Sequence, residues 1–68
     1  MPILTAREKQ IFELLICNKT TSDIASLLNV SEKTIRNHIS NVIQKLDVSS
    51  RTQAIIELLR HNVIKIDK

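Results

Sequence analysis

The segment from Ser31 to Leu46, SEKTIRNHISNVIQKL, decides the fold of this chain. Its aliphatic residues recur at the spacing of one helical face, which predicts an amphipathic α-helix over about residues 32–46. These apolar residues are Ile35, Ile39, Val42, Ile43 and Leu46. We expect this stripe to face the core, and we expect the Ser31 hydroxyl to cap the first turn.

The opposite side of this helix is rich in short amides and hydroxyls, which are weaker helix formers than Glu, Lys or Ala. It carries Lys33, Asn37, Ser40, Asn41 and Gln44, with Arg36 on one flank and Thr34, His38 and Lys45 on the other. A face that only had to be hydrated would not need these side chains. Because they are the groups that bind base edges and phosphates, the face predicts a recognition helix in a major groove of DNA.

The 68 residues have the length of one small domain, and we expect residues 1–68 to fold as one. Glycine is absent, so Asn, Asp or Ser must form the tight turns. The net charge of +3 is localised: the segment from Lys33 to Arg51 contains four basic residues and one acidic residue. A localised basic patch is typical of nucleic-acid binders, although ordinary soluble domains also carry small basic excesses.

Other kinds of site are not indicated. Cys17 is the single cysteine, and we expect a buried structural thiol because it ends an apolar run. His38 and His61 lack companions at the spacing of zinc ligands, so we expect no metal, cofactor or small-molecule ligand. An enzyme is the least expected class, because so small a helical domain has no cleft for a substrate. Without a membrane-spanning run or a signal peptide, we expect a cytoplasmic protein with no membrane contact.

Two shorter helices are predicted before the central one. Thr5 and Glu8 have the spacing of a capping box, which starts a first helix that ends near Cys17. Asn18 is expected in the left-handed conformation at its end. A second helix is predicted over residues 22–28, with Thr20 or Thr21 as its cap and Asn29 as the turn residue after it.

A fourth helix is expected after a turn at Asp47. Ser50 and Gln53 again have the spacing of a capping box, and the helix should run to about Asn62 or Ile64 before the last three residues fray. The short second helix, its three-residue turn and the long third helix make a helix-turn-helix. The complete prediction is an all-α domain of four helices with a helix-turn-helix at its centre.

These motifs resemble the LuxR/NarL/GerE-type helix-turn-helix domain of bacterial transcription regulators. The strings LTAREKQIFELL, TTSDIASLLNVSEKTIRNHISNVIQKL and SSRTQAIIELL carry the resemblance over nearly the whole chain. The succession of IA, VSxxTI, H, KL and RTQA is specific to the family. Among its members, the chain is most similar to a stand-alone regulator of late sporulation genes that has no receiver or sensor domain. Asp47 departs from the Gly or Asn that is frequent there, which should affect only the turn geometry.

The side chains predicted to meet DNA form two groups. Base readers are expected on the middle of the recognition helix, at Arg36, Asn37, Ser40 and Asn41. Phosphate contacts are expected at helix ends and flanks, at Thr21, Ser31, Lys33, Thr34, His38, Lys45 and Arg51. The resemblance supports Lys33 and Thr34 most directly.

Simpler roles stay open for several of these residues. Arg36 can pair with Glu32 one turn earlier. Ser31 and Thr21 can serve only as helix caps, and Lys45 can be a solvated charge. We expect His61, which is not among the DNA contacts, to pair with Glu57 or to be solvated.

The fourth helix has a wider apolar arc than a monomer needs. Ala54, Ile55, Leu58 and Leu59 can face the core, whereas Ile56 and Val63 lie beyond that arc. We predict a homodimer interface at Ile56, Leu59, Arg60 and Val63, and the resemblance implies the same contact. The alternative is that a core wraps round the helix or that these side chains are simply exposed.

The sequence thus predicts a transcription regulator that binds specific double-stranded DNA as a homodimer, with RNA polymerase as a further candidate partner. Two alternatives stay open. The chain can be the output domain of a longer response regulator, although its initial Met and its likeness to a stand-alone regulator favour a complete protein. It can also be a protein-interaction module that has this fold without binding DNA.

Overall fold

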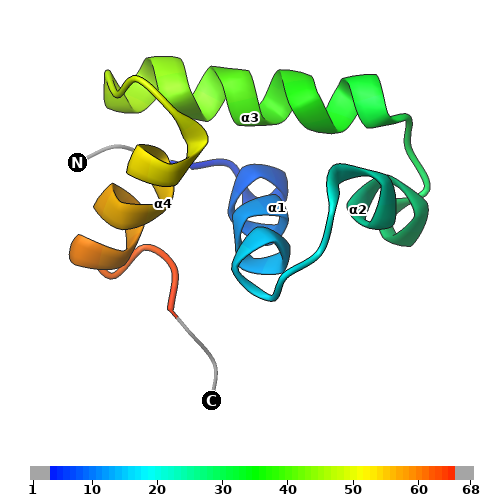
Figure 1. The fold of residues 1–68 in the computed structure, drawn as a ribbon, viewed down its shortest axis with the longest axis horizontal. Coiled ribbons are helices and arrows are strands. Elements are labelled where there is room, and N and C mark those ends of the chain that lie inside the picture. Colours follow the sequence, from blue (N-terminus) through cyan, green and yellow to red (C-terminus); the bar gives the residue numbers. More distant parts are fainter. Residues whose placement is uncertain (1–3, 66–68) are drawn as a thin grey trace.

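The computed structural model describes residues 4–65, which form four α-helices joined by short turns (Figure 1). The helices are α1 (Ala6–Ile16), α2 (Thr21–Leu28), α3 (Glu32–Leu46) and α4 (Arg51–Arg60). No strand occurs in this part of the chain. The all-α class and the central helix-turn-helix are therefore confirmed, and α3 has the predicted bounds. The predicted fraying of the last three residues lies outside the described residues.

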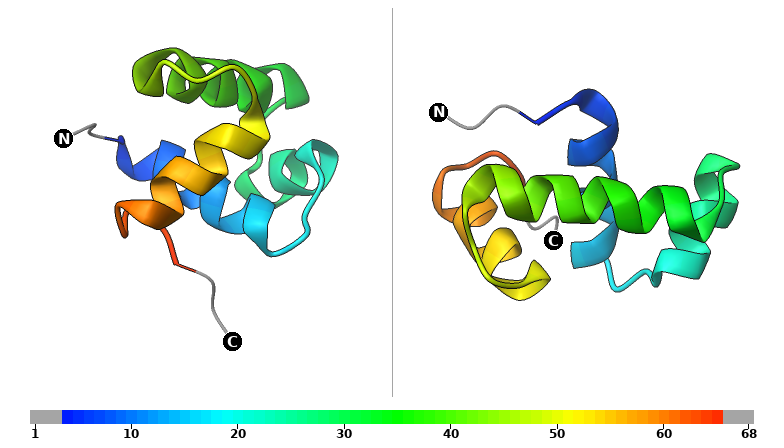
Figure 2. Two further views of the ribbon diagram at one scale, coloured as in Figure 1. Left: turned by 60° about the vertical axis from the view of Figure 1, so that its left-hand side comes forward. Right: turned by 90° about the horizontal axis from the view of Figure 1, so that it is seen from above.

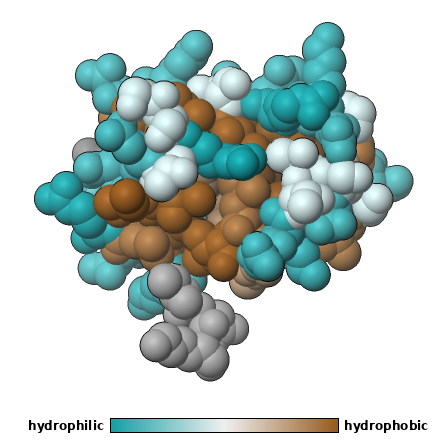
Figure 3. Space-filling model, viewed as in Figure 1, coloured by the Kyte–Doolittle hydropathy of each residue, from teal (hydrophilic) through white to brown (hydrophobic). Residues whose placement is uncertain are grey.

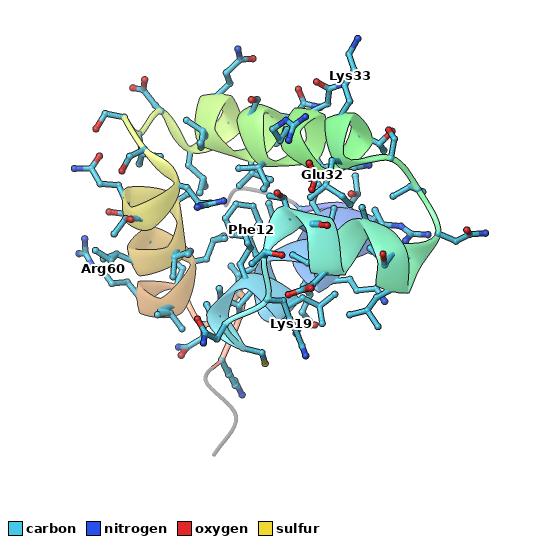
Figure 4. The ribbon with its side chains drawn as sticks, turned by 45° about the vertical axis from the view of Figure 1, so that its right-hand side comes forward. Phe12, Lys19, Glu32, Lys33 and Arg60 are labelled. Carbon is cyan, nitrogen blue, oxygen red and sulfur yellow. The ribbon has the colours of Figure 1, made fainter. Side chains whose placement is uncertain are left out.

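The longest helix, α3, lies across the other three (Figures 1 and 2). It packs against α2 near its beginning, α1 near its middle and α4 near its end. The predicted stripe is its buried face: Ile35, Ile39 and Val42 are buried, and Ile43 and Leu46 pack at the edge of the same core. Phe12 of α1 is fully buried and lies enclosed between the helices (Figure 4).

Hydroxyl caps define the start of every helix. The capping box predicted for α1 is confirmed, because Thr5 Oγ1 accepts from Glu8 N at 3.1 Å and Glu8 Oε1 accepts from Thr5 N at 3.0 Å. Thr20 and Asp23 form a second box at the start of α2. Ser31 is the predicted cap of α3 and accepts from Thr34 N at 3.1 Å.

The capping box predicted for α4 is only half formed. Ser50 Oγ accepts from Gln53 N at 3.2 Å, as expected. The Gln53 side chain, however, accepts from the backbone and hydroxyl of Ser49 at 3.1 and 2.8 Å. The Gln53 oxygen thus bonds one residue further back than the N-cap residue Ser50.

Left-handed residues turn the chain at or just after all four helix ends, in a sequence without glycine. These residues are Asn18, Asn29, Asp47 and Asn62, with φ values of 67°, 59°, 56° and 59°. The left-handed conformation was predicted for Asn18, and Asn29 and Asp47 were predicted as turn residues. Asn and Asp tolerate this conformation better than other residues with a Cβ, so they replace glycine at the helix ends.

The prediction that α4 continues to Asn62 or Ile64 was wrong. The helix ends at Arg60, because Asn62 is left-handed and turns the chain. Val63 N then donates to Leu58 O at 2.9 Å, which closes the end of the helix in a Schellman-type bond. The turn directs Ile64 back into the core, where its side chain is 1% exposed.

The expected burial of Cys17 was also wrong, because the residue is exposed. Cys17 follows the last residue of α1 and is the C-cap of that helix. Cys17 lies five positions after the core residue Phe12, which places the two roughly 140° apart on the helical wheel. The thiol therefore lies on the outside of the turn rather than beneath it.

A partly buried ion pair, which the sequence did not reveal, joins the first turn of α1 to the last turn of α3. Lys45 Nζ lies 2.6 Å from Glu8 Oε1. The Glu8 side chain is only 4% exposed, whereas the Lys45 side chain is 38% exposed. Burial alone would raise the pKa of Glu8. The hydrogen bonds from Lys45 and the Thr5 backbone, with the charges of Lys45 and His38, outweigh that effect and lower the pKa.

This asymmetry of burial leads to a prediction about stability. Lys45→Met should lower the free energy of unfolding by about 2–3 kcal/mol, because it leaves the enclosed carboxylate without its cation. Glu8→Gln should cost only about 1 kcal/mol, because a glutamine can keep the capping bond to Thr5 and the freed lysine can turn to water. Urea unfolding followed by circular dichroism measures both values.

The same pair should make stability depend on pH. Since the folded-state pKa of Glu8 lies below the unfolded value of about 4.3, the pair stabilises the protein above that pH, and its contribution is lost as the pH falls through the folded-state pKa. The difference between wild type and Glu8→Gln should shrink accordingly in acid. If Lys45→Met and Glu8→Gln lowered the free energy of unfolding equally at neutral pH, the asymmetric burial of the ion pair would be contradicted.

Candidate nucleic-acid interface

The outward face of α3 carries the four predicted base readers on one continuous surface. Arg36, Asn37, Ser40 and Asn41 are all exposed, on the side of the helix away from its buried stripe. Hydrophilic and intermediate side chains cover the edge of the molecule over α3, and Lys33 projects away from the body of the protein (Figures 3 and 4). This face therefore presents donors and acceptors to a partner without any change in fold.

A hollow of about 300 Å³ beside this face brings three helices together. Its lining consists of Thr21 from the start of α2, Arg51 from the start of α4, and Arg36, Ile39 and Ser40 from α3. Two predicted phosphate contacts and two predicted base readers, distant in sequence, thus meet at one place. The first amides of a helix have no intrahelical acceptor, so the starts of α2 and α4 add donors next to the basic side chains.

Arg36 is paired with Glu32, as the simpler interpretation of the sequence allowed. Arg36 Nη1 lies 3.1 Å from Glu32 Oε1, and the Arg36 side chain is 59% exposed. Such a surface pair one helical turn apart is worth only about 0.2–0.5 kcal/mol. Two hydrogen bonds to guanine would outweigh it, so the pair orients the guanidinium without preventing base recognition.

The two hydroxyl groups at the start of α3 already have hydrogen-bond partners within the protein. Besides capping the helix, Ser31 Oγ lies 3.0 Å from Thr34 Oγ1, so these two groups hydrogen-bond to each other. Ser31 is exposed and Thr34 is half-buried. A phosphate near this turn would meet the Lys33 ammonium first, because that side chain is exposed and unengaged by any ion pair of the described residues.

The remaining flank of α3 faces α1. His38 is half-buried, and its charge acts on Glu8, which places it toward the start of α1. Lys45 directs its ammonium to the same carboxylate. Of the predicted phosphate contacts, these two therefore lie on the side of α3 opposite the hollow between α2 and α4. Lys45 has a structural role that no pattern in the sequence indicated.

A second hollow, of about 430 Å³, continues from Thr21 and Arg51 toward the turn between α1 and α2. Its other lining residues are Leu15, Asn18, Lys19, Thr20, Thr52 and Ile55. Lys19 and Thr52 were not among the predicted site residues. Their position next to the helix caps was the only signal in the sequence, and it is a weak one, because many helix starts carry such residues.

Of the predicted dimer residues, Ile56, Leu59 and Arg60 lie in α4 and Val63 lies beyond its end; apolar side chains gather over this helix (Figure 3). Ile56 is 49% exposed, whereas Leu59 and Val63 are half-buried against the core. Arg60 projects from the outer side of α4 (Figure 4) and lies 3.2 Å from Glu57. His61 Nε2 lies 3.4 Å from the same carboxylate, which confirms its predicted partner.

Two exposed apolar side chains at the opposite end of the molecule were not predicted. Leu27 of α2 is 60% exposed, and Val30 in the following turn is 37% exposed. Within residues 4–65, no group of three or more His, Cys, Asp or Glu is arranged to hold a metal ion. Nor is any helix of that region long and apolar enough to cross a membrane.

A short helix, a three-residue turn and a longer helix with a polar, partly basic outer face define a helix-turn-helix DNA-binding domain. The family model of bacterial regulatory proteins of the luxR family, GerE, matches residues 2–58. The chain belongs to this family and is a transcription regulator of this type. The family is one of regulators rather than of enzymes.

Known relatives agree with this assignment over almost the whole chain. The spore germination protein GerE of Bacillus subtilis is 57% identical over 65 residues, which cover 96% of this chain and 88% of that protein. The solved structure of the transcription factor GerE matches with a TM-score of 0.92 and 58% identity, over 94% of this chain and 96% of that one.

Longer regulators contain a similar domain. The transcriptional regulatory protein DegU of Brevibacillus brevis is 39% identical over 64 residues, and the response regulator protein VraR of Staphylococcus aureus is 40% identical over 63 residues. The chain spans only 27% and 30% of their respective lengths. The likeness to these two proteins thus concerns one part of each.

Proposed function

We propose that this regulator binds specific double-stranded DNA by placing α3 in a major groove. The observation that carries the proposal is the outward face of α3, where Arg36, Asn37, Ser40 and Asn41 are exposed together on the side away from the core. Arginine and asparagine side chains can each form two hydrogen bonds to one base, worth about 1–3 kcal/mol of discrimination. We assign these four side chains to base recognition.

The surrounding residues are proposed to hold the phosphate backbone. They are Thr21, Ser31, Lys33, Thr34, His38 and Arg51, which lie at helix starts or on the flanks of α3. Thr21 and Arg51 are best supported, because they share a hollow with two base readers. Contacts of this kind fix the register of the protein on DNA and carry no sequence information themselves. The basic segment around α3 adds a long-range attraction.

We further propose a homodimer formed through α4. Ile56 is half-exposed at the middle of the outer face of this helix, with Leu59, Arg60 and Val63 around it. A two-fold contact at α4 would leave both α3 helices free, because α4 packs near the end of α3 rather than on its outward face. Two recognition helices about one DNA turn apart would favour an inverted-repeat site.

The proposed cellular setting is based on the family and on the likeness to a relative that matches 96% of the chain. We propose a cytoplasmic regulator that acts during spore formation or germination, in line with its likeness to the spore germination protein GerE of Bacillus subtilis. RNA polymerase is the proposed further partner, because a regulator of transcription acts on that enzyme. The likeness to DegU and VraR also supports the second candidate, in which the chain serves as the output domain of a longer response regulator.

The assigned roles of the interface residues predict two different responses to substitution. Arg36→Ala or Asn37→Ala should relax the preference at particular base pairs of a site selected from random duplex DNA, because each removes a direct base contact. Arg51→Ala should weaken selected and random DNA alike and reduce the salt slope of binding by about one. Fluorescence anisotropy over a range of salt concentrations measures both effects. If Arg36→Ala weakened both kinds of DNA by the same factor, its assignment to base reading would be wrong.

The exposed apolar side chain of α4 predicts a monomeric variant. Ile56→Glu should give a folded, helical monomer that binds half-sites weakly, because it puts a charge into the proposed interface without touching the core. Leu27→Glu is the matched control, since it changes an even more exposed side chain, at the other end of the molecule. Analytical ultracentrifugation and circular dichroism report association and folding. A wild-type protein that is monomeric on DNA, or an Ile56→Glu variant that associates like Leu27→Glu, would contradict the α4 dimer.

A further inference from the structure

The ion pair between Glu8 and Lys45 bears on how tightly the protein holds the DNA backbone. Lys45 is a cation in the last turn of the proposed recognition helix, a position from which a lysine can reach a phosphate. In the structure, its ammonium lies instead on a carboxylate of α1, at 2.6 Å. The carboxylate thus draws the ammonium toward α1 and accepts one of the hydrogen bonds that the lysine could donate to a phosphate.

The Glu8 carboxylate is held firmly in that place. Its side chain is 4% exposed, and the oxygen that binds Lys45 also accepts from the Thr5 backbone amide at 3.0 Å. This second bond belongs to the capping box that starts α1, so the carboxylate cannot turn away without disturbing the helix. Its lowered pKa keeps the group ionised at neutral pH.

Transfer of Lys45 to a phosphate would leave the enclosed carboxylate without its cation, which is unfavourable. A phosphate at the surface is solvated by water and counterions, so it attracts the ammonium less strongly than the enclosed carboxylate does. Resting on the proposed DNA binding, we infer that Glu8 is a positioning residue: it withholds Lys45 from the DNA backbone and so lowers the electrostatic part of the affinity for DNA of any sequence.

The reason is that non-specific binding comes almost entirely from phosphate neutralisation, whereas specific binding also has base contacts. Withholding one cation from the backbone therefore weakens the binding of random DNA and of a specific site by about the same factor. The base readers Arg36 and Asn37 lie on the outward face of α3 and keep their contacts. A residue of α1 that touches no DNA would thus set the sequence-independent part of the affinity and leave the preference for one sequence over another unchanged.

The test measures the affinity of purified protein for a random-sequence duplex as a function of salt concentration. Glu8→Gln should bind this duplex more tightly and make the slope of log K against log salt steeper by about 0.9, the value for one additional phosphate. Gln keeps the acceptor of the capping box, so the variant should stay folded, which circular dichroism checks. Glu13→Gln is the matched control, because it removes an exposed acid from the same helix.

A double variant separates the lysine from the general change in charge. Glu8→Gln combined with Lys45→Ala leaves no orphaned charge, and its slope should return to the wild-type value. If Glu8→Gln and Glu13→Gln gave the same slope, or if the double variant kept the steeper slope of Glu8→Gln, the inference would be overturned. A wild-type protein without any salt-dependent DNA binding would instead contradict the proposed function itself.

Discussion

The burial of one stripe of α3 is the constraint on which the rest of the structure depends. Ile35, Ile39 and Val42 enter a core to which α1, α2 and α4 all contribute, and α3 packs against each of these helices. Once the stripe is fixed, the helix cannot rotate without exposing aliphatic surface, at a cost of about 25 cal/mol per Å². The opposite face must therefore point outward, and its polar side chains are held ready for a partner.

The short connections make this arrangement stiff. At or just after each helix end, an Asn or Asp in the left-handed conformation turns the chain where other proteins use glycine. These residues restrict the unfolded chain more than glycine would, which is useful to a domain with a small core. The ion pair between Glu8 and Lys45 adds a tie between the first turn of α1 and the last turn of α3. Core, turns and ion pair together fix the orientation of the recognition helix.

Local patterns in the sequence predicted most of the fold, because they depend on neighbouring residues. The periodicity of α3, the cap at Ser31 and the turns at Asn18, Asn29 and Asp47 are of this kind. Features that depend on distant residues were not predictable. Glu8 and Lys45 are 37 positions apart, so the sequence suggested only a cap for one and a phosphate contact for the other. The burial of Ile64 likewise depends on a turn that the helical pattern of α4 concealed.

The central claim, that the outward face of α3 reads DNA, is tested most directly by nuclear magnetic resonance. The backbone amides of the ¹⁵N-labelled protein would be followed during titration with a duplex chosen by binding-site selection. The account predicts that the largest shifts fall on the outward face of α3, around Arg36 and Ser40, and on the starts of α2 and α4. Shifts confined to the exposed apolar end around Leu27, with α3 unchanged, would contradict it.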